Sequence, residues 1–492
     1  MSAESVAIIP PVNLNSLESP LRFIQSTQDD FRPPQWLAEY ESWWQKEGQG
    51  ISDAVDRAGT PWLRMFDRSG SRVDDILYSP DYWRMLKRGY QSGLLWRCFE
   101  ENTLVPAGLG IYVTSFYDPG LACPYTVSLS TLIPLLKYGD AEIRQRFVAN
   151  LLQKYESVWQ GATWMTEIKG GSDLGNNVET VARPRDSYWV LTGDKYFSSN
   201  AGAELAVVAA RPEGAPAGVR GLALYLVPRY RQDGRLNYFI RRLKDKIATR
   251  SVPTGEIELR ESEAWLLGEA ATGIYLILEV LNSSRVSNSL GSVALAQRAM
   301  ADALSFAQNR RIFGKPLIEQ PLMRRQFEER FRQLRAAAKL AWKSLELLNE
   351  VWQQKPPYSD RFHLFRLVAH LAKYWTAELA VQTAKWSMEV HGGLGTLQEF
   401  RAERWLREAM ILAIWEGPSH RQILDAVEVM ERRCAHRLLF DYLSAGVAVS
   451  ERNEMEAQVE RHLALPREEK EAGAEALIAQ LAAFTADALL QL

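Results

Sequence analysis

The sequence predicts a mostly helical, multidomain α+β fold, based on chain length, a β-rich segment near the middle and helical patterns on both sides of it. At 492 residues the chain is too long for one compact core, so two to four domains are expected. The patterns divide it into an N-terminal arm (1–35), an N-terminal helical domain (36–158), a central β-barrel or sheet domain (159–268), a C-terminal four-helix bundle (269–435) and a short acidic helical extension (436–492).

The segments before the β-rich region are predicted to be an arm followed by helices. The arm contains Pro10-Pro11 and Pro33-Pro34, which favour an extended chain. From Trp36 to about Tyr155 the apolar residues are spaced as they are in helices. We therefore expect this second segment to be helical.

The β-rich segment lies between about 159 and 268. Its stretch SYWVLTGDKYFSS is predicted to form two strands around a turn at Thr192-Gly193-Asp194. Three further β-rich runs follow with turn residues between them, AELAVVAAR, GLALYLVP and GEIELRE. These runs predict a small β domain.

The chain is predicted to become helical again from Gly273. Leu290, Val293 and Leu304 lie on one helical face, with Gln297 as its one polar interruption. The segments at about 317–353 and 362–390 behave similarly, and Pro356-Pro357 marks the break between them. The pattern is typical of an antiparallel helix bundle.

The overall charge argues against a protein that binds polyanions through bulk charge, since 58 basic and 60 acidic side chains give a formal charge of −2. Cys98, Cys123 and Cys434 are too few and too scattered for a disulfide framework or a cysteine metal site, so we expect no metal. The N-terminus does not resemble a signal peptide, and no uncharged apolar run approaches the roughly 18 residues of a membrane helix. A reducing cytoplasm is the expected location.

The C-terminal tail is acidic. Residues 441–492 contain ten acidic and four basic side chains. The pattern suggests two amphipathic helices with an acidic face.

Two segments contain most of the residues that could perform chemistry. WMTEIKGGSD occupies 164–173, and a second stretch runs from EVHGGLG at 389 to IWEG, which ends at 417. Glycines allow close approach of the backbone, and amides with the Ser172 hydroxyl can satisfy phosphate oxygens. Taken alone, Gly-Gly-Ser-Asp is more often a polar turn, and Gly-Gly-x-Gly more often ends a helix.

Glu416 is the candidate base. It follows an apolar run and precedes Pro418, which is well placed for the first turn of a helix. Burial raises the pKa of a carboxyl and a helix N-terminus lowers it, and the sequence leaves open which effect dominates. The alternative is that Glu416 only caps the helix.

The order and separation of these segments, with NRRIFGKPL at 309–317 between them, resemble the acyl-CoA dehydrogenase superfamily of flavoproteins. MFDRSGSRVDDILYSPDYWRML, RRLKDKIATRS and WEGPS are similar to its AidB-like branch, the adaptive-response or alkylation-protection branch. The resemblance covers most of residues 20–440. It implies FAD as cofactor, Glu416 as catalytic base and a homotetramer, as a dimer of dimers.

The resemblance also implies how the flavin would be held. Main-chain groups around Met165 and Thr166 would face the flavin pyrimidine, and Ser199 would lie near flavin N5. Arg310 would reach the FAD of a neighbouring subunit, although from its own motif a solvated helix-end cation is equally expected. The implied cofactor-binding residues are Met165, Thr166, Gly171, Ser172, Phe197, Ser199, Arg310, Phe313, Glu389, Gly392, Gly393, Ile414, Pro418 and His420.

Some positions depart from the family pattern. Pro418 stands where most relatives have Thr or Ser, and His420 stands where an amide is common. Trp164 replaces a small residue, which predicts a narrower pocket. The implied substrate contacts are Trp164, Ser172 and Arg285, and Arg285 has no neighbouring carboxylate that could replace Glu416 as base.

The function implied is α,β-dehydrogenation of an acyl thioester carried by CoA or by a carrier protein. Glu416 would remove the α-proton, and the β-hydrogen would leave as hydride to flavin N5. The electron acceptor would be a protein such as an electron-transfer flavoprotein. The alternative is an AidB-like, DNA-associated flavoprotein that protects against alkylation damage with weak or no dehydrogenase activity, although the acidic tail disfavours DNA binding.

Overall fold

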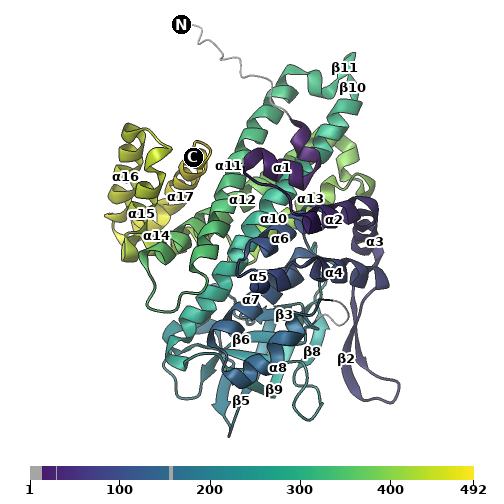
Figure 1. Cartoon of the computed structure of the whole chain (residues 1–492), viewed down its shortest axis with the longest axis vertical. Coiled ribbons are helices and arrows are strands. Elements are labelled where there is room, and N and C mark those ends of the chain that lie inside the picture. The colour runs from purple at the N-terminus through teal and green to yellow at the C-terminus, as the bar shows by residue number, and fades with distance from the viewer. Residues whose placement is uncertain (1–13, 29, 155–158) are drawn as a thin grey trace.

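The computed structural model describes residues 14–28, 30–154 and 159–492 (Figure 1). A long helical bundle stands above a β domain, and further helices lie on both sides of the bundle. The mostly helical fold class with a central sheet is therefore confirmed. Residues 1–13 of the expected arm, and Tyr155, lie outside the described residues.

The N-terminal part is mainly helical, and its helices begin at recognisable caps. Ser19, Ser79 and Asp140 each accept a hydrogen bond from a backbone N–H in the first turn of the helix that follows. The α-helices are α1 (Pro20–Thr27), α2 (Gln35–Trp43), α3 (Gln49–Ala58), α4 (Pro80–Ser92), α5 (Trp96–Glu100), α6 (Val105–Tyr117), α7 (Ala122–Tyr138) and α8 (Ala141–Leu151). Shorter helical turns are η1 (Leu14–Glu18) and the π-helical η2 (Trp44–Gly48).

The expectation of helix throughout 36–155 is wrong in one place. Strands β1 (Trp62–Phe66) and β2 (Arg72–Leu77) form an antiparallel hairpin, which extends away from the body in Figure 1. Its turn is stabilised by Asp67, whose Oδ1 accepts hydrogen bonds from the backbone N–H groups of Ser69 and Ser71. The buried Asp74 carboxylate accepts from the backbone N–H of Ile240 at 2.8 Å and so ties the hairpin to the β domain.

The β domain contains a closed ring of five strands. Strands β6, β4, β5, β9 and β7 pair in that order, and β7 pairs back with β6, while β3 adds to β6 and β8 adds to β9. The elements are β3 (Gly161–Trp164), α9 (Leu174–Asn177), β4 (Val181–Pro184), β5 (Trp189–Ser199), β6 (Leu205–Pro212), β7 (Ala223–Pro228), β8 (Phe239–Leu243) and β9 (Thr254–Leu266).

The turn expected at Thr192-Gly193-Asp194 is also wrong, because β5 continues through it. Its pairing with β9 shifts register between Leu191 and Gly193. Gly193 has φ +152, and a Cβ there would lie 2.6 Å from Thr180 Oγ1. The glycine therefore permits a bulge in one continuous strand, since the close approach leaves no room for a side chain.

The bundle contains long helices joined by short connections. Gln297, the expected polar interruption in α10, accepts a hydrogen bond from the Tyr112 hydroxyl at 2.8 Å and donates to the carbonyls of Leu17 and Ser19. The helices are α10 (Gly273–Asn309), α11 (Pro321–Val351), α12 (Asp360–His391), α13 (Ala402–Ile414) and α14 (Ser419–Arg433). Strands β10 (Arg311–Ile312) and β11 (Lys315–Pro316) form a small hairpin at the top of Figure 1.

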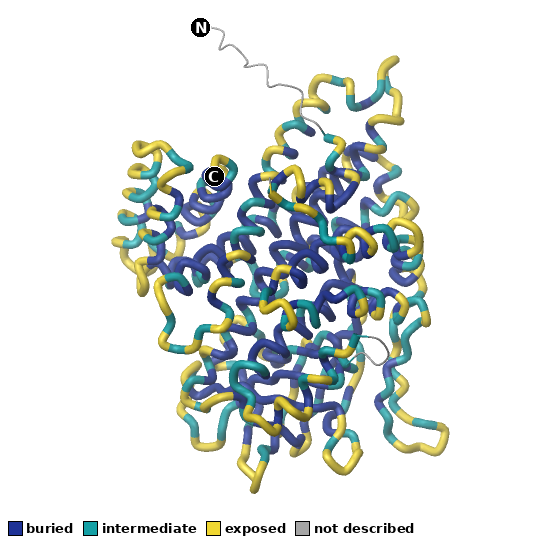
Figure 2. Tube along the Cα trace, viewed as in Figure 1, coloured by how far each residue is buried: buried dark blue, intermediate teal, exposed yellow. Residues whose placement is uncertain are grey.

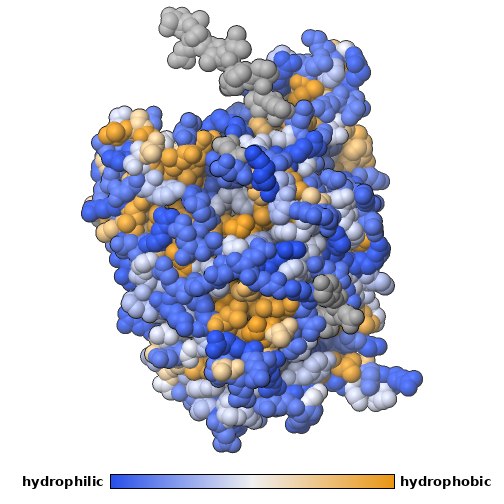
Figure 3. Space-filling model, viewed as in Figure 1, coloured by the Kyte–Doolittle hydropathy of each residue, from blue (hydrophilic) through white to orange (hydrophobic). Residues whose placement is uncertain are grey.

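The tail forms helices that pack on the bundle. They are α15 (Ala435–Tyr442), α16 (Val449–Leu463) and α17 (Arg467–Leu489), so the two expected tail helices are present. Leu477, Ile478 and Leu481 of α17 are buried, as the dark tube at the C-terminus in Figure 2 shows. The acidic side chains of α16 and α17 are not buried. Figure 3 shows that the surface of the molecule in this view has hydrophobic patches between larger hydrophilic areas.

Within the residues that the structure describes, no helix is long and apolar enough to cross a membrane. The same residues contain no group of three His, Cys, Asp or Glu side chains arranged to hold a metal ion.

Candidate active site

Glu416 lies in the short loop between α13 and α14, and this loop has a fixed backbone. Glu416 has φ +58, which is unusual for a residue with a side chain, and Gly417 has φ +96. The Glu416 carbonyl accepts hydrogen bonds from Arg285 Nε at 3.1 Å and from Gln422 Nε2 at 2.9 Å. Lys373 Nζ donates to the carbonyls of Ala413 and Gly417 at 3.0 and 2.8 Å. These bonds hold the unfavourable conformation in place.

Burial dominates the ionisation of Glu416. It raises the pKa of this carboxyl to about 7, although the positive charges of Arg285 and Lys373 oppose the rise. The side chain does not cap α14, whose N-cap position is taken by Pro418 without a side-chain hydrogen bond. A carboxyl that titrates near neutral pH is suited to act as a general base.

The groups beneath the loop form a buried polar layer. Arg285 also donates to Asn282 Oδ1 at 2.9 Å and to Asp425 Oδ2 at 3.4 Å, so each of its three guanidinium nitrogens has an internal partner. Its side chain is only 4% exposed, and the direct contact of Arg285 with substrate that the resemblance implies stays a prediction. Burial lowers the pKa of Lys373 to about 7, and Arg285 lowers it further, despite the opposing charge of Glu416.

A small apolar cluster connects Glu416 to the β domain. Cys123 of α7, Val127 and Val252 are buried together, and Trp415 packs on them. Burial raises the pKa of the Cys123 thiol to about 12; the nearby charge of Glu416 also raises it, whereas Lys246 and a hydrogen bond with Ser199 lower it. The candidate base and the Ser199 hydroxyl are thus both near this thiol.

The first signature segment forms a turn next to this cluster. The Thr166 carbonyl accepts a hydrogen bond from the backbone N–H of Tyr196 at 3.0 Å, which places the turn beside β5. A Cβ on Gly171 would lie 2.4 Å from Thr166 Oγ1, so only glycine fits there. Ser172 and Phe197 are exposed, and Met165 is buried against the main core.

The expectation that Trp164 narrows the pocket is corrected. Its side chain is 1% exposed and packs in the interior of the β domain, with its ring centroid 4.8 Å from that of Tyr238. Its Nε1 donates to the Ser199 carbonyl at 3.1 Å. Since alternate residues of a strand face opposite sides of a sheet, Trp164 supports β5 from inside the barrel.

The remaining residues of the expected cofactor set lie at the surface. Phe313 is 94% exposed with φ +47 on the β10–β11 hairpin, and Arg310 beside it is also exposed. A Cβ added to Gly392 or Gly393 would meet nothing within 4 Å. Exposed side chains on the other segments are those of Glu389, Ile414 and His420. The single chain therefore does not bring Arg310 and Phe313 to Glu416.

Sequence reasoning missed three residues of the site: Cys123, Lys246 and Lys373. Lys373 could have been noticed, because it is a lone cation in the apolar helical run HLAKYW. Lys246 lies in the segment RRLKDKIATRS, which contains several cations and no local signal of which of them turns inward.

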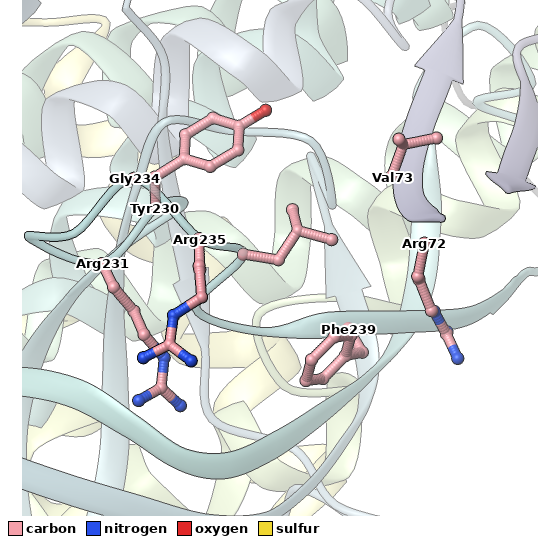
Figure 4. A pocket seen from close by; sticks show the side chains of 8 residues that line it. Arg72, Val73, Tyr230, Arg231, Gly234, Arg235 and Phe239 are labelled. Atoms are coloured by element: carbon pink, nitrogen blue, oxygen red, sulfur yellow. The ribbon is translucent and has the colours of Figure 1, made fainter. Parts of the chain in front are cut away.

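Two open cavities lie on the β-domain side. One of about 560 Å³ lies between β2 and the loop before β8, and Figure 4 shows Arg72, Arg231 and Arg235 at its edge with Tyr230 and Phe239. The other, of about 430 Å³, is lined by residues 60–63 and Met65 at β1, by residues 241–246, and by Arg250, Val252 and Pro253. The second adjoins the candidate site, because Val252 belongs to the cluster with Cys123.

Comparison with known proteins gives consistent matches along the chain. Residues 10–157 match the family model of the adaptive response protein AidB N-terminal domain. Residues 162–262 match the acyl-CoA dehydrogenase middle domain, and residues 271–430 match the acyl-CoA dehydrogenase C-terminal domain. AidB of Escherichia coli (strain K12) is 29% identical over 402 residues, which cover 78% of this chain and 71% of that protein.

Solved structures share the fold. Caenorhabditis elegans ACDH-11 in complex with C11-CoA is 21% identical, with a TM-score of 0.83 over 99% of this chain and 89% of that chain. An acyl-CoA dehydrogenase complexed with FAD from Bacillus anthracis is 18% identical, with a TM-score of 0.75 over 94% of this chain and 81% of that chain.

Proposed function

Because the chain belongs to the acyl-CoA dehydrogenase family and is an oxidoreductase of the type that acts on CH–CH groups, we propose that it performs α,β-dehydrogenation of an acyl thioester. The thioester would be carried by CoA or by a carrier protein. The observation that carries this proposal is Glu416, a carboxyl with its pKa raised to about 7 on a loop whose backbone is held by Arg285, Lys373 and Gln422.

FAD is the proposed cofactor, and the residues present fit it. Gly171 packs so closely against Thr166 Oγ1 that the turn admits no side chain there, Ser172 presents an exposed hydroxyl, and Phe197 and Ile414 are large apolar side chains that are 55% and 59% exposed. Aromatic and aliphatic side chains at this level of exposure are suited to pack on a planar ring system. When bound, FAD would accept the hydride, and the protein would supply orientation and the base.

Each of these residues would then have a separate role in catalysis or in cofactor binding. Glu416 would take the α-proton, and the cations Arg285 and Lys373 beneath its loop would limit how far burial raises its pKa. Met165 and Thr166, with Gly171 and Ser172, would hold the cofactor from the β domain, and Pro418 and His420 would lie at its bundle side. Exclusion of water by Trp415, Cys123 and Val252 would strengthen the charge interactions at the base.

Arg310, Phe313, Glu389, Gly392 and Gly393 are proposed to complete the cofactor site of a neighbouring subunit. The almost fully exposed Phe313 and the open space over Gly392 and Gly393 leave these positions accessible to a second copy of the chain, and a homotetramer is the proposed assembly. An electron-transfer flavoprotein is the proposed electron acceptor.

The experiment that tests this function is product analysis. Purified protein supplied with FAD and a panel of acyl-CoA thioesters is expected to release a thioester lighter by two hydrogens, which mass spectrometry detects. A protein that binds FAD but converts no acyl-CoA or acyl-carrier thioester to the unsaturated product would contradict the proposal.

DNA association is the second candidate, and the match of residues 10–157 to the AidB N-terminal model favours it. The docked tail opposes it, since the acidic residues of α16 and α17 face outward and would repel phosphates. We therefore expect no mobility shift of duplex DNA at low salt. A shift that weakens steeply as salt is added would instead support the DNA-associated function.

A further inference from the structure

Next to the candidate site, Ser199, Thr254 and Lys246 are linked by hydrogen bonds between their two hydroxyl groups and one ammonium group. Ser199 on β5 and Thr254 on β9 are cross-strand partners, and their hydroxyl oxygens lie 3.2 Å apart. Lys246 Nζ lies 2.9 Å from Thr254 Oγ1, and also 2.9 Å from Thr249 Oγ1 and from the Val252 carbonyl. The ammonium group therefore has one acceptor for each of its three protons.

This arrangement favours one direction for the hydroxyl protons, because the charge of Lys246 lies next to the Thr254 oxygen. A protonated lysine can only donate, so Thr254 Oγ1 must accept from Lys246. Its own proton is then free to be donated to Ser199 Oγ. Ser199 then accepts that bond and donates its own proton outside the strand pair, where the sulfur of Cys123 is one neighbouring acceptor.

We propose that Lys246 is a positioning residue that acts through Thr254 to keep the Ser199 hydroxyl donating toward the flavin. This inference rests on the proposed function, in which the resemblance places Ser199 near flavin N5. A hydrogen bond donated to a flavin nitrogen favours the reduced cofactor, because negative charge develops on the ring as it accepts hydride.

The surroundings of Lys246 make the hydrogen bonds between Lys246, Thr254 and Ser199 dependent on pH. Burial lowers the pKa of Lys246 to about 8, although Cys123 of α7 and Glu408 of α13 raise it. Lys244, Asp245 and Arg250 are charged neighbours on its own segment, and Arg407 of α13 donates to the Ile247 carbonyl. A neutral amine can accept the Thr254 proton, and Ser199 would then donate to Thr254 instead of to the flavin.

The test uses the FAD-loaded protein and measures the absorption band and reduction potential of the flavin against pH. In the natural chain, both are expected to change as pH rises through about 8. Lys246→Met is expected to lose this transition, to keep the high-pH spectrum throughout, and to be reduced by substrate about tenfold more slowly at neutral pH. Lys246→Arg, which stays charged, is expected to keep the low-pH spectrum and to move the transition upward.

Variants at Thr254 distinguish an effect transmitted through the hydrogen bonds of Lys246, Thr254 and Ser199 from a direct effect of the Lys246 charge on the flavin. Thr254→Val removes the hydroxyl and should also abolish the transition, whereas Thr254→Ser should retain it. Glu408→Gln is the control for a second nearby group, since burial raises the pKa of Glu408 to about 7. This variant should keep the transition and move it to lower pH, because the charge of Glu408 raises the pKa of Lys246. If Lys246→Met folds poorly, the two Thr254 variants still decide the matter.

Two results would overturn the inference. One is a transition that survives in Thr254→Val but disappears in Lys246→Met, which would show that Lys246 acts by charge alone. The other is a flavin potential that is independent of pH around 8 in the natural chain. A protein that binds no FAD would contradict the proposed function itself, so the two failures are distinguishable.

Discussion

Glu416→Gln is expected to slow reduction of the flavin by an acyl thioester by at least about a hundredfold, within the range of about 10²–10⁴ that a general base contributes. The amide is close in size to the carboxyl but accepts no proton from the substrate. In the natural chain, the rate is expected to rise as pH increases through about 7, because the base must be ionised and burial raises its pKa to that value. Stopped-flow absorbance under anaerobic conditions measures both.

Glu408→Gln is the matched control for this prediction. Glu408 is a buried carboxyl whose pKa burial also raises to about 7, but it accepts a hydrogen bond from the backbone N–H of Thr249 at 2.9 Å. It belongs to a different polar cluster from the partly buried Glu416. In the Glu408→Gln variant, the acyl thioester should reduce the flavin at nearly the rate of the natural chain. If Glu416→Gln binds FAD and also reduces it normally, Glu416 is not the base.

Lys195→Met is expected to lower the free energy of unfolding by about 3–5 kcal/mol, the usual effect of leaving one member of a buried ion pair without its partner. Lys195 is fully buried, and its Nζ donates to Glu167 Oε1 at 2.6 Å and to the Ala209 carbonyl at 2.7 Å. Glu167 also accepts from the Thr180 hydroxyl at 2.6 Å. Urea denaturation of the FAD-free protein measures the change.

The control is the double variant Glu167→Gln/Lys195→Met, which removes both charges and should recover part of the loss. The pH dependence has a defined sign. Burial alone would raise the pKa of Glu167, but Lys195 and the hydrogen bonds to Thr180 and Glu179 lower it overall. The pair therefore stabilises the fold above the ordinary carboxyl pKa, and this stability is lost as the pH falls below that range. Equal stability of the natural chain and Lys195→Met would contradict the account.

The element pattern of the bundle could be predicted because long amphipathic helices leave a clear periodic signal. Pro356-Pro357 and the glycines at 392–395 lie at helix ends, as predicted. Proline restricts its own backbone and glycine permits conformations that end a helix, so both signals are local in the sequence. The β1–β2 hairpin could not, because its strands are short and half-exposed, and their stability depends on the distant bond from Asp74 to Ile240.

Residues of the candidate site could be predicted only where a short sequence motif contains them. Glu416 was identified from Trp-Glu-Gly, but the balance of burial and charge on it depends on Arg285 and Lys373, which come from other helices. The inward direction of Trp164 depends on the register of β3 against β6. The internal partners of Arg285 could not be predicted, because Glu416 and Asp425 come near it only once the helices are packed.

The most direct test of the account is the visible absorption spectrum of the purified protein before and after anaerobic addition of acyl-CoA thioesters. The account predicts the spectrum of bound oxidised FAD, followed by bleaching with at least one member of the panel. A purified protein that takes up no FAD, or one with bound FAD that no acyl thioester bleaches, would contradict it.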